Sequence, residues 1–187
     1  MAEHVAEEIR DLGVLSLAEN RESLLMWAHY ADRHRGFLIG FERDGRIIED
    51  GLVFRFGIAA MSYSHSRPST REFHDLSDEA LYFRKSSEWS HEREWRMVTS
   101  ILAVTQDVEG VRDKHRFAFR LVARDLRAVV VGHRAAGLFP ELYDLLRQER
   151  YAHVSLQLAI RDLKEYRLNI KEWPRTEWTD VPAELSR

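Results

Sequence analysis

Charged side chains at regular spacing mark one stretch of the sequence as a place where chemistry could occur. Glu92, Glu94 and Arg96 alternate along the chain. Side chains two residues apart in a strand lie on the same face, so a strand beginning near Glu92 would hold all three together. A predicted helix over residues 77–87 carries Lys85, which could reach the same place. Two carboxylates beside two cations can stabilise a developing positive charge or hold a divalent metal ion.

Two interpretations of this row of charges remain open. Trp95, Met97 and Thr99 form the opposite face of the same predicted strand, and Trp95 and Met97 make that face a core face. The charges would then form a solvated outer face, which composition alone favours. Alternatively, they line a cleft in which Arg96 keeps the carboxylates ionised.

A second group of reactive side chains lies in residues 25–37, where a helix is predicted. Apolar residues recur at helical spacing, which predicts a helix over roughly 22–33 with Trp27 in its buried stripe. Gly36 suits the left-handed conformation that ends many helices.

The polar aromatic residues of this predicted helix point in different directions. Met26, Tyr30 and His34 follow one another at a spacing of four and share a face. His29 points about 100° away from Tyr30, so both side chains cannot lie in the core and one should face a cleft or solvent. Either they make local hydrogen bonds that tie the helix to a sheet, or they belong to a site.

Short strands and helices must position these two segments. Strands are predicted at 37–41, 52–58, 92–102, 117–121, 129–131, 154–160 and 166–170. Further helices are predicted at 77–87 and from Pro140, and Ser16 to Glu19 has the pattern of a helix capping box. Because helices do not alternate regularly with strands, we expect an α+β fold with a mixed, mostly antiparallel sheet and a few short helices. One domain should span residues 1–187, with its core at about 12–172 and extensions at 1–11 and 174–187.

Composition excludes several classes of protein. Hydrophobic residues make up 44% of the 187 residues, so the chain can form a core and is not a disordered polypeptide. The absence of cysteine excludes disulfides, cysteine-zinc sites and a thiol nucleophile, and fits a cytoplasmic location. A net charge of −3 does not favour nucleic acid as a partner, although residues 112–127 are locally basic. No membrane partner is expected, and the scattered histidines predict no metal site.

Together the two segments resemble domain-of-unknown-function family 2971, a family of uncharacterised bacterial proteins. Residues 25–37 correspond to its pattern Leu-Met-Trp-x-His-Tyr-Ala-x-x-His-x-Gly-Phe, and residues 15–17 to the Leu-Ser-Leu that precedes it. Lys85 and residues 89–96 correspond to a Lys followed by Trp-x-x-Glu-x-Glu-Trp-Arg, and residues 129–132 to a later apolar strand ending in Gly.

The resemblance covers about residues 12–172 in order. Members of the family usually have an extra N-terminal segment, whereas this chain begins at the lead into the first helix. We therefore expect either a shortened chain or a reduced member of the family.

The layout of the family is similar to that of the ADP-ribosyltransferase fold, which implies nicotinamide adenine dinucleotide (NAD) as cofactor. In that case Glu92 and Glu94 would be the catalytic Glu-x-Glu pair, with Lys85 beside them. One carboxylate would bind the ribose and stabilise the oxocarbenium ion, and the other would orient the acceptor. Trp27 or Tyr30 would stack on the nicotinamide ring. The substrate-binding residues expected on this basis are Trp27, His29, Tyr30, His34 and Arg96.

Three functions are compatible with these residues. The favoured one is a noncatalytic binding or regulatory module in which the polar residues close a buried network. The first alternative is an ADP-ribosyltransferase-like enzyme, acting as a toxin or a phage-defence effector. The second is a metal-dependent nuclease in which Glu92, Glu94 and Lys85 surround a divalent cation. If these residues form one site, His29, Tyr30, Lys85, Glu92, Glu94 and Arg96 should converge in space.

Overall fold

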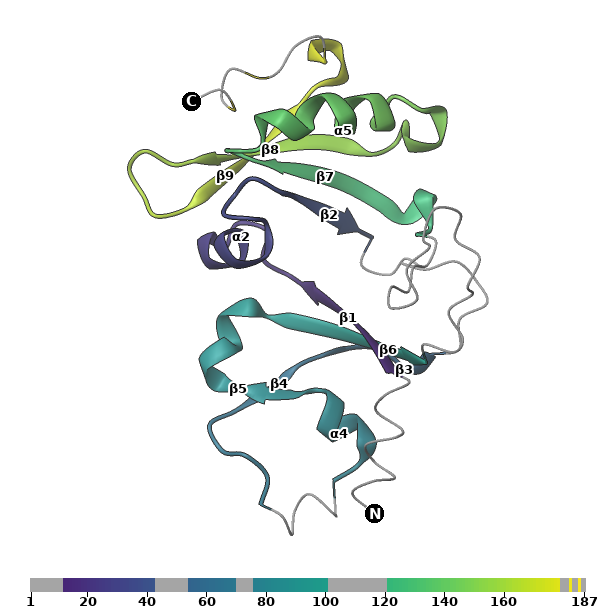
Figure 1. Cartoon of the computed structure of the whole chain (residues 1–187), viewed down its shortest axis with the longest axis vertical. Helices are drawn as coiled ribbons and strands as arrows, with labels where there is room; N and C mark the ends of the chain where they lie inside the picture. Colours follow the sequence, from purple (N-terminus) through teal and green to yellow (C-terminus); the bar gives the residue numbers. More distant parts are fainter. Residues whose placement is uncertain are drawn as a thin grey trace. The chain divides into compact units, whose positions relative to one another are not determined.

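The computed structural model describes residues 12–42, 54–69, 76–100 and 121–178, together with 182 and 185. The chain forms two compact units, and each unit combines two separate stretches of sequence. The first unit comprises Met1–Asn20 and Ile48–Arg120, and the second comprises Arg21–Ile47 and Leu121–Arg187. Figure 1 shows the elements of both units. The prediction of a single domain over residues 1–187 stays a prediction.

The first unit is built on an antiparallel sheet of three strands, with β6 in the centre (Figure 1). Its strands are β1 (Leu12–Ala18), β3 (Phe54–Ala60) and β6 (Glu94–Ser100). A short parallel pair, a helix and a 3-10 helix complete it: β4 (Ser62–Ser64), β5 (Arg84–Ser86), α4 (Asp78–Tyr82) and η1 (Ser87–Glu92). β1 pairs with β6 along its full length, from Leu12 opposite Ser100 to Ala18 opposite Glu94.

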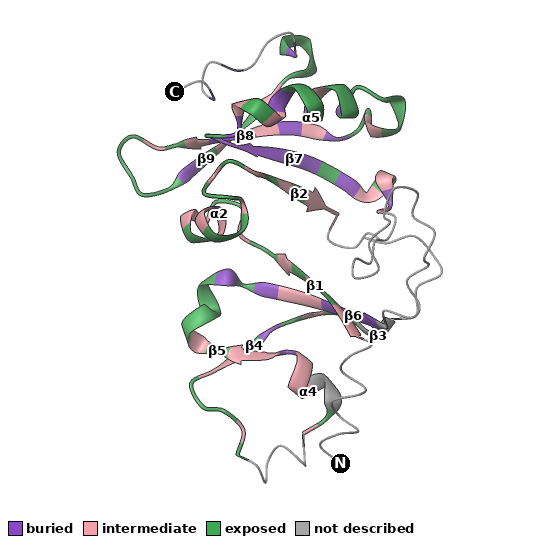
Figure 2. Cartoon of the chain, viewed as in Figure 1, coloured by how far each residue is buried: buried purple, intermediate pink, exposed green. Residues whose placement is uncertain are grey.

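Both faces of β6 are covered. Met97 and Thr99 are buried on one face, and Val98 is fully buried on the other, where it packs against Met61 and Phe83. Figure 2 shows this strand mostly in the colours of buried and half-buried residues. The strand can therefore carry charge at its N-terminal end only if partners within the protein compensate that charge.

The second unit contains a mixed sheet in the order β2-β7-β8-β9. Its strands are β2 (Phe37–Phe41), β7 (Leu126–Gly132), β8 (Ser155–Arg161) and β9 (Leu168–Trp173). Its helices are α2 (Leu24–Tyr30) and α5 (Phe139–Leu146), and its 3-10 turns are η3 (Ala123–Asp125), η4 (Ala136–Leu138), η5 (Glu149–Tyr151) and η6 (Arg175–Glu177). β7 and β8 are parallel, and the other pairs are antiparallel.

The two faces of this sheet pack against different helices. Val129 and Val131 belong to a cluster with residues of α5, whereas Val130 belongs to a cluster with Trp27 of α2. Successive side chains of a strand point to opposite faces, so a strand covered on both sides reads as a continuous apolar run. This arrangement explains why residues 129–131 are all valine, and it confirms the central strand predicted there.

The α+β class with mostly antiparallel pairing is confirmed, as are the strands near 37–41, 54–60, 94–100 and 155–161. Pro140 lies in the first turn of α5, as predicted. Residues 117–120 of the strand predicted at 117–121, and most of the basic segment 112–127, lie outside the described residues. No helix in the described part of the chain is long and apolar enough to span a bilayer.

Several predicted element boundaries in the first unit are wrong. The helix over 77–87 ends at Tyr82, so Lys85 lies on the short strand β5. Glu92 lies in η1 rather than on the strand, which begins at Glu94. Ser16 does not cap a helix but lies in β1, where it faces Arg96 in register. Short elements of three to six residues lack the repeated pattern that sequence periodicity needs.

The first helix is also shorter than predicted. α2 ends at Tyr30, and its N-terminus is capped by Ser23, whose hydroxyl accepts a hydrogen bond from the Met26 N–H at 3.4 Å. The left-handed conformation predicted for Gly36 is instead taken by residues 32–34. His34 therefore leaves the helical face predicted for it together with Met26 and Tyr30.

Candidate functional site

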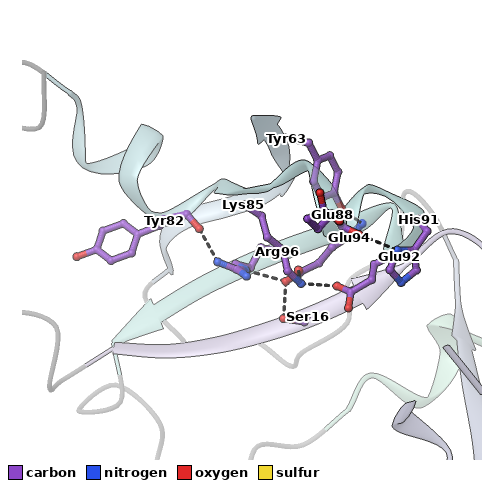
Figure 3. Close-up of polar contacts among 9 residues, drawn as sticks. All are labelled: Ser16, Tyr63, Tyr82, Lys85, Glu88, His91, Glu92, Glu94 and Arg96. Carbon is purple, nitrogen blue, oxygen red and sulfur yellow. Dashed lines mark hydrogen bonds and ion pairs between the residues drawn. The ribbon is translucent and has the colours of Figure 1, made fainter. Parts of the chain in front are cut away.

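The charges of the first unit converge on Glu94 (Figure 3). One carboxylate oxygen, Oε1, accepts hydrogen bonds from Ser16 Oγ at 2.7 Å and from Arg96 Nε at 2.8 Å. The other, Oε2, accepts one from Lys85 Nζ at 2.8 Å. Lys85 Nζ also donates to Glu92 Oε2, so one ammonium group bridges the two carboxylates. Four of the six residues predicted to converge, Lys85, Glu92, Glu94 and Arg96, therefore lie together. The other two, His29 and Tyr30, belong to the second unit.

A sharp turn between Glu92 and Glu94 makes this convergence possible. Arg93 has φ 44° and ψ 51°, the left-handed region, and it ends η1. Its N–H donates to Ser90 O at 3.2 Å. Although Glu92 and Glu94 do not belong to the same strand, this turn lets both carboxylates reach Lys85. They meet through a turn rather than through the strand period on which the prediction rested.

The backbone N–H and carbonyl groups of Glu94 are hydrogen-bonded as well as its side chain. The Glu94 N–H donates to Tyr63 Oη at 2.8 Å, and the Glu94 carbonyl accepts from the Met61 N–H at 2.9 Å. Arg96 extends the network by donating from Nη1 to Tyr82 O at 2.7 Å. Ser16 and Tyr63 thus belong to the cluster, although neither is among the site residues predicted from the sequence.

Burial decides between the two interpretations of these charges. Glu92 is 3% exposed and Glu94 5%, so the solvated outer face favoured by composition is wrong for both carboxylates. Burial by itself raises the pKa of Glu94, but the hydrogen bonds from Arg96, Lys85 and Ser16 outweigh it and lower the pKa to about 2. Glu94 is therefore an anion at neutral pH, with a partner on each oxygen.

The same network keeps the Lys85 ammonium group protonated. Burial acts to lower the pKa of its ammonium group, but its hydrogen bonds to Glu92 and Glu94 raise that pKa above its usual value. Its Nζ also lies 5.3 Å from the centre of the Trp89 ring, a cation–π distance. A cation therefore already lies between the two carboxylates.

An open pocket of about 520 Å³ lies beside this cluster in the same unit. Its lining carries the hydroxyl-bearing residues Ser62, Tyr63 and Ser64, together with Arg84. Arg84 Nη2 donates to Ser64 Oγ at 2.9 Å. Tyr63 connects the pocket to the cluster, because its hydroxyl is the group that accepts the Glu94 N–H.

The other predicted site residues belong to the second unit. Trp27 is 2% exposed, and its Nε1–H donates to Arg21 O at 2.7 Å. His34 lies parallel to the Trp27 ring, with 6.3 Å between the ring centres. His29 and Tyr30 are both exposed, as the helical geometry required of at least one of them.

Among the described residues, no group of three or more His, Asp or Glu side chains is placed to hold a metal ion. The roles assigned from the family resemblance to the residues of both units stay predictions.

Comparison with known proteins supports the resemblance found in the sequence. The family model described as Protein of unknown function (DUF2971) matches residues 26–97. This stretch contains most of both segments on which the resemblance rests. Searches of curated proteins and of solved structures find no match.

Proposed function

We propose that the chain is a binding or regulatory module in which the cluster maintains the fold. The family model that matches residues 26–97 describes proteins of unknown function, so the proposal is argued from the cluster itself. One observation carries this proposal. Both oxygens of Glu94 already accept hydrogen bonds from the protein, from Ser16 and Arg96 on one side and from Lys85 on the other. A carboxylate has about four acceptor sites, and three donors of the protein already occupy those of Glu94, which leaves little capacity for a substrate.

The same observation favours this function over the two enzymatic alternatives. In the transferase, one carboxylate would bind the ribose and the other would orient the acceptor. The second carboxylate of the pair, Glu92, is 3% exposed and bonded to Lys85. In the nuclease, a divalent metal would occupy the space between the carboxylates, where the Lys85 ammonium lies. In both alternatives the ion pairs of Lys85 with Glu92 and Glu94 would have to break before a substrate or a metal could bind. Breaking them would leave buried carboxylates unpaired, which is energetically costly.

The pocket beside β4 provides the place where a ligand would bind. Its volume of about 520 Å³ lies within the range of small-molecule sites, roughly 300–1,000 Å³. Serine hydroxyls and the Tyr63 ring offer hydrogen bonds and contact area to a polar ligand. Because Tyr63 also bonds to the Glu94 backbone, a ligand that moved Tyr63 would alter the cluster and transmit binding to β6.

The test compares Glu94→Gln with a matched surface variant, Glu88→Gln. Breaking a buried ion pair costs about 3–5 kcal/mol, which lowers the melting temperature of a chain of this length by roughly 10 °C. Glu88 is exposed in η1, so Glu88→Gln should leave the melting temperature unchanged. Thermal unfolding followed by circular dichroism measures both variants.

Calorimetry with NAD separates the proposal from its main alternative. We expect no binding of NAD to the wild-type chain. The proposal would be overturned if Glu94→Gln still bound NAD and kept the wild-type melting temperature but lost ADP-ribose transfer. That result would identify Glu94 as catalytic.

A further inference from the structure

Two histidines of the second unit face each other with buried, unbonded nitrogen atoms. The centres of the His34 and His133 rings lie 4.7 Å apart. The Nδ1 atom of each ring is buried and has no hydrogen-bond partner among the described residues. His133 is only 8% exposed. Buried polar atoms in proteins are nearly always hydrogen-bonded, so two adjacent exceptions need an explanation, and a bound water or ion is one.

The backbone holds these rings in place at the end of β7. The Arg134 N–H donates to His34 O at 3.1 Å, and the Gly132 N–H donates to Gly36 O at 3.0 Å. A Cβ atom on Gly132 would come within 2.3 Å of His34 O, so only glycine allows this approach. His34 itself has φ 68°. Asp32 and Arg33 also have positive φ, so the whole turn before Gly36 is left-handed.

Two arginines lie at the same edge of the sheet. β7 and β8 are parallel, with Gly132 opposite Ala159, so β8 ends at Arg161 beside the end of β7. Ala159 packs in the Trp27 cluster, and side chains two apart share a face, so Arg161 points to the side where His34 lies against Trp27. Arg134 directly follows His133 in the sequence.

The four groups carry an excess of positive charge. Burial lowers the pKa of His34, and the positive charges of Arg134 and Arg161 lower it further. Burial also lowers the pKa of His133, to about 4, with His34 and both arginines adding to the effect. Asp32, which lies close enough to sense Arg134, has both carboxylate oxygens bonded to Arg35.

We propose that His34, His133, Arg134 and Arg161 form a binding site for a phosphate-class anion. The site lies at the carboxyl ends of β7 and β8, the one parallel pair of this sheet. Guanidinium groups bind phosphate oxygens through charge-assisted hydrogen bonds, and each Nδ1 atom, once it carries a proton, can donate to the same anion. This site lies in the second unit and does not depend on the proposed role of Glu94.

The first test measures binding of inorganic phosphate by calorimetry. The wild-type chain should bind phosphate, and Arg161→Gln should weaken binding about tenfold or more, because hydrogen bonds to charged groups are among the stronger ones. The matched control is Arg127→Gln, since Arg127 is an exposed arginine of β7 that pairs with Glu42. No binding by the wild type, or equal weakening in both variants, would overturn the proposal. Arg161 is exposed, so its replacement leaves the core intact.

The second test uses sulfate, which keeps its charge between pH 6.5 and pH 4. A bound anion raises the pKa of His133 from about 4 toward its usual 6.5, so sulfate should bind more tightly as the pH falls through this range. His133→Gln should remove most of this dependence. His153→Gln should not, because His153 is exposed and bonded to Ala123 O. A pH dependence that is absent, or that persists unchanged in His133→Gln, contradicts the proposal.

Two further ligands identify the source of the anion. Adenosine monophosphate should bind and adenosine should not, because the site recognises the phosphate group. Tighter binding of adenosine monophosphate than of phosphate would indicate a phosphorylated ligand, and equal binding would indicate a free anion. Binding of adenosine with the same affinity as its monophosphate would overturn the proposal.

Discussion

The contribution of Glu94 to stability depends on its being ionised. Its pKa is about 2 in the folded chain, against 4.5 for an ordinary glutamate, because the hydrogen bonds of Arg96, Lys85 and Ser16 more than offset burial. A carboxyl group whose pKa falls on folding stabilises the folded state wherever it is ionised, and this stabilisation is lost as it becomes protonated.

The first prediction follows from the sign of this shift. The stabilisation should be complete above pH 4.5 and should disappear as the pH falls to about 2, a loss of about 3 kcal/mol. Urea unfolding at a series of pH values over this range measures it. Glu94→Gln should show a flatter profile than the wild type, since its amide does not titrate. Identical slopes in the two proteins would show that other groups cause the acid sensitivity.

Part of the cluster could be predicted from the sequence at this scale. The close spacing of Glu92, Glu94 and Arg96 was enough to predict that they share one place, even though Glu92 proved to lie in a 3-10 turn. Ser16 reaches the cluster through the pairing of β1 with β6, and Tyr63 through the chain that follows β3. A single hydroxyl far away in the sequence leaves no periodic signal, so neither residue could be predicted.

At the scale of elements, close backbone approach explains two glycines of the second unit. A Cβ on Gly36 would lie 3.1 Å from the backbone of Ala31, and one on Gly132 would lie 2.3 Å from His34 O. Gly36 is therefore needed for space rather than for the left-handed conformation that the sequence suggested. Gly132 lets the turn over residues 32–34 lie against the end of β7, and Gly36 lets the chain pass close to Ala31.

The second prediction compares two glycine-to-alanine variants. Gly132→Ala should destabilise the chain by at least about 2 kcal/mol, because its methyl group must displace backbone atoms. Gly137→Ala is the control, since nothing lies within 4 Å of a Cβ at that position. Denaturant unfolding of both variants measures the difference. Equal stability would mean that the turn and the strand end do not approach as closely as described.

The third prediction concerns the turn that joins η1 to β6. Arg93 is exposed and has φ 44°, a conformation that costs a non-glycine residue about 1–2 kcal/mol. Arg93→Gly should therefore stabilise the chain by about 0.5–1 kcal/mol after allowing for the greater flexibility of unfolded glycine. Arg93→Val should destabilise it, because β-branched residues rarely adopt this region. Melting temperatures in the opposite order would refute the left-handed turn.

The longer elements could be predicted from the sequence, and the shortest ones could not. Residues 155–161 of β8 and 94–100 of β6 showed the expected alternation, and both are strands. β5 is only three residues long, and η1 interrupts the polar segment before β6, so neither produced a pattern. The sequence pattern therefore places Lys85 on a helix, although its spacing correctly predicts the contact with the carboxylates.

At the scale of the whole molecule, the two units interleave along the chain. The family match, residues 26–97, takes in α2 and β2 of the second unit and β3 to β6 of the first. It includes neither β1, which pairs with β6, nor β7, which pairs with β2. The segment recognised by the family model is therefore not a unit of structure, and no periodic feature of the sequence indicated this interleaving.

The fourth prediction tests this division. A fragment of residues 26–97 should lack a cooperative unfolding transition. In it β2 has lost its partner β7, and β6 has lost β1 and pairs only with β3. Circular dichroism during heating, with the full chain as the reference, measures the transition. A cooperative transition in the fragment would show that the matched segment folds by itself.

The order in which strands leave the ribosome has a consequence for how this protein reaches its native state. β1 is synthesised early, but its partner β6 follows only after the first stretch of the second unit has been made. β2 stays without a partner for longer still, because its Phe37 pairs with Val131 of β7. Two unpaired strands from different units are thus exposed together on the nascent chain, and long-range pairing of this kind is slow and open to aggregation. Rapid binding of a chaperone to the nascent chain before residue 131 emerges would protect both strands until their sheets can close.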